Sequence, residues 1–233
     1  MHKHNLLLLP ALISDDRLWE QQIAALADIA TITVADLSGA NSITTLAATA
    51  LQQAPAGPLA IAGLSMGGYV ALEIMRQAPQ RISALALLDT SARADTAEAT
   101  NNRQKNMQLA QTDYNKVIDE LIAKLIHPSQ LSDQRQINTV KAMAQSLGKD
   151  VFVRQQQAII GRIDSRPFLK NISCPTLILC GRGDLITPVE IHEEMHSAIS
   201  SSTLVVVEQC GHLSSLGQPQ EVSDAMREWL APL

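Results

Sequence analysis

The sequence predicts an α/β protein built on one mostly parallel sheet, and two observations support that prediction. Short apolar runs alternate with amphipathic helical patterns along most of the 233 residues, which is the order of parallel strands joined by helices. The runs are mostly apolar or β-branched, as expected for strands that are covered on both faces. With 46% hydrophobic residues, the chain can bury one large core.

Four runs in the first part of the chain have the short, apolar or β-branched character of buried strands: residues 6–9, 29–34, 59–62 and 82–88. Apolar residues at helical spacing separate them in three segments: residues 15–26, 43–54 and 66–78. Pro55 and Gly57 close the second of these segments. Strands and helices therefore alternate as far as Leu88.

The alternation breaks once, between residues 92 and 165. This stretch is polar, lacks strand-like runs and carries amphipathic helical patterns, such as the one that includes Val117 and Leu121. Beyond it, strands are expected at 176–180 and 203–207, each followed by a helix. We expect a core domain of residues 1–91 and 166–233, with residues 92–165 inserted as a helical cap that acts as a lid. A solvated helical subdomain is the alternative.

One turn has the pattern of a catalytic nucleophile. The apolar run 59–62 meets Gly63-Leu64-Ser65-Met66-Gly67, and a helical segment follows directly. Small residues on either side of a serine allow a sharp strand-to-helix turn that lifts the hydroxyl above the sheet edge. The helix N-terminus favours an anion, and the Met66 amide points to where an oxyanion would form. A glycine-rich turn without chemistry is the alternative.

A nucleophilic serine needs a base to take its proton and a third group to orient that base. Asp184 follows the strand expected at 176–180, and His212 follows the strand expected at 203–207. Both would lie at the carboxyl edge of the sheet, where catalytic groups of open parallel sheets gather. Asp89 also ends a strand and is a rival acid, since the order Ser, Asp, His fits both aspartates. Turn capping by the aspartates and a buried structural histidine are the alternatives.

With these residues the chain resembles the α/β-hydrolase family over nearly its whole length. The specific similarities are Gly63-Leu64-Ser65-Met66-Gly67-Gly68, Gly181-Arg182-Gly183-Asp184 with Thr187-Pro188, and Gly211-His212-Leu213 with Gln218-Pro219. The resemblance implies an α/β-hydrolase fold with helices on both faces, a cap, and about six parallel strands without the family's first two. It also implies that Ser65 attacks an acyl carbon, His212 moves the proton and Asp184, in preference to Asp89, orients the imidazole.

The chain departs from the family pattern at one position. Members usually carry His-Gly after the first strand of the core, where this chain has Pro10 and Ala11. The second amide of the oxyanion hole then falls on Leu12. Because a backbone donor does not depend on its side chain, we expect the amides of Met66 and Leu12 to form the hole.

A second motif points to different chemistry. Residues 192–196 match H-E-x-x-H, in which two histidines one helical turn apart ligate zinc and the glutamate acts as a base. No third ligand is evident just downstream, and the glutamates also suit the early turns of a helix beginning near Pro188. We therefore interpret the motif as the surface of an amphipathic helix, with Met195 and Ile199 in its buried stripe, and expect no metal.

These features predict a serine hydrolase that cleaves a small carboxylic ester, thioester or lactone through an acyl-enzyme intermediate, without a cofactor. Within the family, residues 87–93 and 212–215 look most like enol-lactone hydrolases. The same triad on this fold can also run carbon–carbon bond cleavage or elimination, and a silent small-molecule receptor can keep the fold without chemistry. A zinc peptidase is the hypothesis attached to the H-E-x-x-H motif.

The charge distribution suggests an anionic acyl substrate. More than half of the Lys and Arg residues lie in 92–165, where Asp and Glu nearly balance them. A slightly basic cap over an acidic core would suit such a substrate, with Arg93, Arg103 and Arg162 as candidate contacts. Replacing them should then raise KM for anionic substrates.

Overall charge and cysteine content argue against other partners. A formal net charge of −5 does not indicate the basic surface that binds nucleic acid. No Lys/Arg-rich run suggests binding to a membrane surface. Cys174, Cys180 and Cys210 are odd in number and lack metal-type spacing, so we expect reduced thiols and a cytoplasmic location. The apolar start of the chain is too short for a signal peptide and contains Pro10, and no run approaches a membrane span. The sequence does not indicate an oligomeric state.

Overall fold

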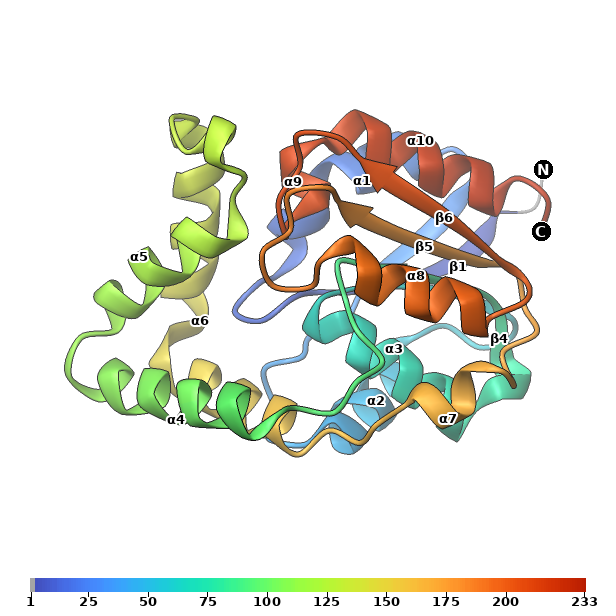
Figure 1. Cartoon of the computed structure of the whole chain (residues 1–233). Coiled ribbons are helices and arrows are strands. Elements are labelled where there is room, and N and C mark those ends of the chain that lie inside the picture. The colour runs from blue at the N-terminus through green and yellow to red at the C-terminus, as the bar shows by residue number, and fades with distance from the viewer. Residues whose placement is uncertain (1–2) are drawn as a thin grey trace.

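A computed structural model describes residues 3–233, which form a six-stranded sheet covered by helices on both faces (Figure 1). The strands are β1 (His4–Leu9), β2 (Ala30–Val34), β3 (Leu59–Leu64), β4 (Ile82–Leu88), β5 (Thr176–Gly181) and β6 (Ser202–Val207). Their order is β2-β1-β3-β4-β5-β6, and each neighbouring pair is parallel. The expected α/β fold with a parallel sheet is confirmed.

The two faces of the sheet bury different sets of side chains, because successive strand residues point in opposite directions. Leu6 and Leu8 join one cluster, and Leu7 and Leu9 join the other. The first face is covered by η1 (Asp16–Trp19), α1 (Glu20–Leu26), α9 (Ser214–Gly217) and α10 (Pro219–Leu230). The second is covered by α2 (Ile43–Gln53), α3 (Met66–Gln77), α7 (Arg166–Leu169) and α8 (Val189–Ala198), and η2 (Pro79–Arg81) leads into β4.

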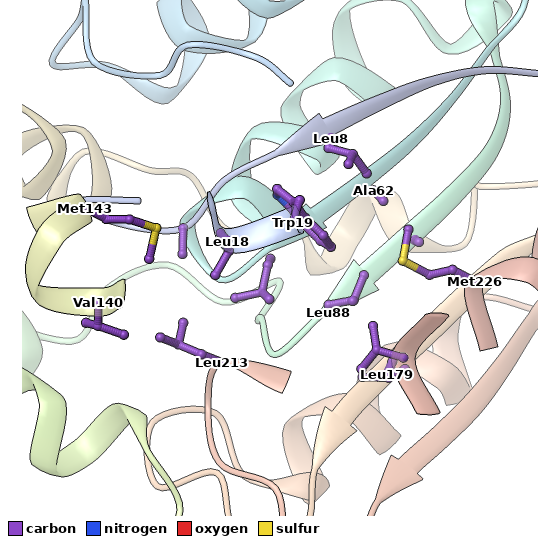
Figure 2. Close-up of a cluster of buried hydrophobic side chains, with 14 of the residues drawn as sticks. Leu8, Leu18, Trp19, Ala62, Leu88, Val140, Met143, Leu179, Leu213 and Met226 are labelled. Atoms are coloured by element: carbon purple, nitrogen blue, oxygen red, sulfur yellow. The ribbon is translucent and has the colours of Figure 1, made fainter. Parts of the chain in front are cut away.

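The segment between β4 and β5 is helical, as expected. It contains α4 (Ala97–Thr112), α5 (Tyr114–Leu125), η3 (Pro128–Gln130) and α6 (Gln134–Ile160), which lie beyond the carboxyl ends of the strands (Figure 1). Figure 2 shows Val140 and Met143 of α6 in the same cluster as Leu18 and Leu213. The insertion thus shares apolar packing with the core, and the division into a core domain and a cap domain stays a prediction.

The carboxyl edge of the sheet is also where the backbone is strained. From β1 the chain crosses to β2 and then returns to β3 on the other side of β1, which makes β1 and β3 the switch point of the sheet. Outside glycine, positive φ angles within residues 3–233 occur at Ile13 (48°), Ser65 (54°), Asp89 (46°) and Gln209 (49°). Each of these residues follows a strand at this edge. Such strain clusters at functional sites.

The three cysteines are free thiols, and Cys180 and Cys210 are buried. Burial raises the pKa of Cys180 to about 12, and burial likewise raises the pKa of Cys210. Within residues 3–233, no helix is both long enough and apolar enough to cross a bilayer.

Candidate active site

Ser65 sits on a sharp turn between β3 and α3. Its φ of 54° and ψ of −112° reverse the chain, and its amide donates to the carbonyl of Leu88 at 2.9 Å. A Cβ added to Gly63 would lie 2.2 Å from the Gly67 carbonyl oxygen, and one added to Gly67 would lie 1.9 Å from the Leu9 carbonyl oxygen. Glycine is therefore required at both positions, because strand and helix backbones touch there.

The structure brings Ser65, His212 and Asp184 into one hydrogen-bonded series. His212 Nε2 lies 2.7 Å from Ser65 Oγ, and His212 Nδ1 lies 2.7 Å from Asp184 Oδ2. The series requires the tautomer in which Nδ1–H donates to the carboxylate and Nε2 accepts from the hydroxyl. His212 and Asp184 are buried, while Ser65 is partly exposed.

Asp184 is held in place by its own loop. The amides of Ile186 and Thr187 donate to Oδ1 at 2.7 and 3.0 Å, and the Thr187 hydroxyl donates to Oδ2 at 2.7 Å. Burial opposes ionisation of Asp184, but the charge of His212 and these hydrogen bonds outweigh it and lower the pKa to about 2. For His212, burial favours the neutral form, but the Asp184 carboxylate outweighs it and raises the pKa above the usual value. The carboxylate therefore stabilises an imidazolium in this position.

Asp89, the rival acid, makes other bonds. Its Oδ1 accepts from the Gly181 amide and its Oδ2 from the Ser214 amide, each at 3.0 Å. Burial and the nearby charge of Asp184 raise the pKa of Asp89 to about 7. Asp184 is therefore the carboxylate that bonds the His212 ring, and Asp89 bonds only backbone amides among the described residues.

The amides of Met66 and Leu12 remain available as donors. Neither donates to a protein acceptor anywhere in residues 3–233. The start of α3 abuts the loop after β1, because Gly67 touches the backbone of Leu9 and Pro10. That loop is fixed by Ile13, whose amide donates to Gln155 Oε1 of α6 at 2.8 Å.

A cavity of about 290 Å³ opens beside Ser65 and His212. Leu12 and Leu213 belong to its core side. The inserted helices supply the opposite side, which is partly polar and includes Asn102, Arg103, Asn106, Leu121, Lys124 and Val140. At the low end of the usual range for ligand pockets, about 300–1,000 Å³, this cavity suits a small molecule.

The insertion also contacts the loop that carries the histidine. The His212 amide donates to the Leu125 carbonyl at 2.9 Å. A Cβ added to Gly211 would lie 2.6 Å from the His127 amide nitrogen, so the two backbones are in direct contact. The Leu125 carbonyl is a site contact that sequence reasoning missed, because backbone groups carry no residue signature.

The three arginines expected to meet an anionic substrate lie in different places. Arg93 pairs with Glu194 at 2.9 Å, and Arg162 pairs with Asp95 at 2.7 Å while its guanidinium lies 4.4 Å from the centre of the Tyr69 ring. Arg103 also pairs with Asp95, and of the three it is the one that lines the cavity. Lys124, which also lines the cavity, was missed because exposed lysines are common on helices.

The interpretation of the H-E-x-x-H motif as helix surface is wrong for His192. This residue is fully buried, its Nε2 accepts from the Thr90 amide at 3.0 Å, and its Nδ1 faces the Pro188 carbonyl at 3.3 Å. Burial lowers the pKa of His192 to about 4, which keeps the ring neutral. His196 is exposed and bonds Ser202 at 2.8 Å. His192 lies one turn before Met195, so it belongs to the buried stripe in which Met195 was correctly placed.

Comparison with known proteins adds sequence relatives to this geometry. The chain is 25% identical over 228 residues to the pimeloyl-[acyl-carrier protein] methyl ester esterase of Vibrio campbellii. The aligned region covers 91% of this chain and 89% of that protein. The enzyme of the same name from Neisseria meningitidis serogroup C is 27% identical over 188 residues, which cover 74% of this chain and 70% of that protein.

Solved structures agree in fold. A thermophilic esterase from Thermogutta terrifontis superposes with a TM-score of 0.89 at 29% identity, covering 98% of this chain and 90% of that one. The enol-lactonase from Burkholderia xenovorans LB400 also reaches 0.89 at 19% identity, covering 99% and 92%, and shows likeness of fold alone. The family model of the alpha/beta hydrolase fold matches residues 5–219. The chain belongs to the alpha/beta hydrolase fold family.

Proposed function

We propose that this protein is a serine hydrolase of small carboxylic esters, thioesters or lactones, in which Ser65 is the nucleophile, His212 the general base and Asp184 the orienting acid. The observation that carries the proposal is the hydrogen-bonded series from Ser65 Oγ through His212 to Asp184, with 2.7 Å at each step. Esterase relatives that cover most of the chain support the same reaction class.

In the first half-reaction, Ser65 Oγ attacks the acyl carbon while its proton moves to His212 Nε2. The amides of Met66 and Leu12 donate to the oxyanion that develops on the former carbonyl oxygen. The Asp184 carboxylate, which bonds Nδ1–H, stabilises the imidazolium. As the tetrahedral intermediate collapses, the bond to the leaving oxygen or sulfur breaks, and His212 gives that atom the proton.

In the second half-reaction, water replaces the leaving group. His212 Nε2 takes a proton from water as the oxygen attacks the acyl carbon of the Ser65 ester. Collapse then breaks the bond to Ser65 Oγ, which regains a proton from His212. The products are a carboxylic acid and an alcohol or thiol, and a lactone gives the hydroxy acid.

The cavity supports a small, anionic substrate. No aspartate or glutamate is among the described residues that line it, whereas Arg103 and Lys124 are. Asp95 is shared by Arg103 and Arg162, so this cluster carries one excess positive charge beside the cavity. A carboxylate on the substrate would gain from that charge in a partly desolvated site. In this proposal residues 92–165 act as the lid that encloses the substrate.

The deciding experiment is intact-protein mass spectrometry after exposure to a fluorophosphonate, with Ser65→Ala and His212→Ala as controls. We expect one adduct on the wild type and none on either variant. A folded wild type without an adduct would refute the proposal. Product analysis on a panel of p-nitrophenyl esters and simple lactones then separates hydrolysis from ligand binding without turnover.

A further inference from the structure

The end of strand β4 contacts all three loops that carry the proposed triad. At the nucleophile, the Leu88 carbonyl accepts from the Ser65 amide at 2.9 Å. The Thr90 hydroxyl donates to the Ser65 carbonyl at 2.8 Å. Thr90 is fully buried and fills the space beside Gly68, where an added Cβ would lie 2.3 Å from Thr90 Oγ1. The turn at Ser65 is therefore held to β4 from both sides of the serine.

Asp89 joins the other two loops. One carboxylate oxygen accepts from the amide of Gly181, the residue that ends β5 before the Asp184 turn, and the other accepts from the amide of Ser214, two residues after His212. Asp89 is fully buried and has a φ of 46°. A buried carboxylate on a strained backbone is costly for a fold to keep. Its two bonds set the spacing between the acid loop and the histidine loop.

His192 in turn fixes Thr90. Its Nε2 accepts from the Thr90 amide at 3.0 Å, and its Nδ1–H is directed at the Pro188 carbonyl at 3.3 Å. The bond to Thr90 needs a neutral ring with a free lone pair on Nε2. The buried imidazole therefore accepts from an amide that would otherwise lack a partner in the interior.

We propose that Asp89, Thr90 and His192 are positioning residues, which set the Ser65, Asp184 and His212 loops at reacting distance without touching the substrate. The inference rests on the proposed function. Catalytic groups need to be held within about 0.5 Å of their productive geometry by bonded supporting groups. One strand end that bonds all three loops supplies that support.

Thr90 offers the sharpest test, because Thr90→Val keeps the shape of the side chain and replaces the hydroxyl with a methyl group. One net hydrogen bond corresponds to about a 2- to 12-fold change in rate. We expect Thr90→Val to lower the rate constant for fluorophosphonate labelling by that factor, and to lower kcat for p-nitrophenyl acetate with KM unchanged. Thr90→Ser restores the hydroxyl and should stay within about twofold of the wild type.

Asp89→Asn probes the other two loops. Asparagine keeps the shape but has a single acceptor oxygen, so one of the two backbone amides loses its partner. An unsatisfied buried donor predicts a fall in labelling rate of about 5- to 160-fold. Should this variant fail to fold, Thr90→Val still decides the question.

Thr176→Val is the matched control. Thr176 is buried, and its hydroxyl donates to the Cys174 carbonyl at 2.9 Å, but it begins β5 at the opposite edge of the sheet. Its loss should lower thermal stability about as much as Thr90→Val does and leave labelling unchanged.

Slow labelling of folded Thr90→Val, with normal labelling of Thr90→Ser and Thr176→Val, would support the proposal. Normal labelling of folded Thr90→Val would overturn it. Equal slowing in Thr90→Val and Thr176→Val would also overturn it, because the effect would then follow from stability. A wild type that is not labelled at all refutes the proposed function itself, and the positioning roles with it, before any variant is compared.

Discussion

Gly211 tests whether the inserted helices hold the histidine loop in place. A Cβ at this position would lie 2.6 Å from the His127 amide nitrogen and 2.8 Å from the Leu125 carbonyl oxygen. Both are backbone atoms, so no change of rotamer relieves the contact. To regain ordinary contact at 3.4 Å, the two segments must separate by about 0.8 Å. That shift would stretch the 2.9 Å bond from the His212 amide to the Leu125 carbonyl.

Gly211→Ala should therefore lower both stability and turnover. Overpacking of this kind costs about 1–3 kcal/mol of unfolding free energy, and a shift near 1 Å in a catalytic group costs about 100-fold in rate. Urea unfolding and kcat for p-nitrophenyl acetate measure the two effects. Gly161→Ala is the control, because its added Cβ would come no closer than 3.6 Å to other atoms. A Gly211→Ala variant as active as the control would refute the idea that this contact positions His212.

Three further predictions follow from the site. Because Asp184 raises the pKa of His212, the acidic limb of the kcat/KM profile should lie above pH 6.5. Asp184→Asn should shift that limb to lower pH and reduce kcat by about 10⁴-fold. An unshifted limb in the variant would count against the pairing of Asp184 with His212. Since the pKa of Asp184 falls from 3.8 to about 2 on folding, its contribution of about 2 kcal/mol is present above pH 4 and lost as the pH falls through 2. Acid titration of wild type against Asp184→Asn, followed by circular dichroism, checks this, and parallel curves would contradict it. Arg103→Gln and Lys124→Gln should each raise KM for the anionic ester mono-p-nitrophenyl glutarate several-fold and leave KM for p-nitrophenyl butyrate unchanged. Arg93→Gln, which removes an arginine outside the cavity, is the control. Equal effects on both esters would argue against an anionic substrate.

Local pattern was enough to predict the elements that position the site. The strand expected at 82–88 is β4, and the helix expected at 66–78 differs from α3 by one residue at its end. The turn at Ser65 was equally predictable, because a strand, a glycine-flanked serine and a helix are set by residues close together in sequence. The candidate acid was chosen over Asp89 from the family resemblance, without any distance to His212.

The burial and the pairing of polar side chains could not be predicted from local sequence pattern. His192 was expected on the surface, since H-E-x-x-H gives no sign of which helical face meets β4, yet its ring is buried against Thr90. Of the three candidate arginines, only Arg103 lines the cavity, whereas Arg93 pairs with Glu194 and Arg162 pairs with Asp95. These pairings join residues roughly 70 to 100 positions apart in the chain, and no local pattern encodes them.

The sequence by itself determined the parallel fold, the Ser65 turn and the chain positions of Asp184 and His212. The fold follows from apolar periodicity and the Ser65 turn from residues that only a particular turn accepts, whereas Asp184 and His212 were predicted from strand ends, chain order and the family resemblance. Tertiary structure alone decided that Asp184 bonds His212 while Asp89 bonds the backbone of two loops. Both aspartates end neighbouring strands, so the choice depends on where each strand stops relative to the histidine loop. Those relative positions arise only when the sheet, the insertion and the loops pack together.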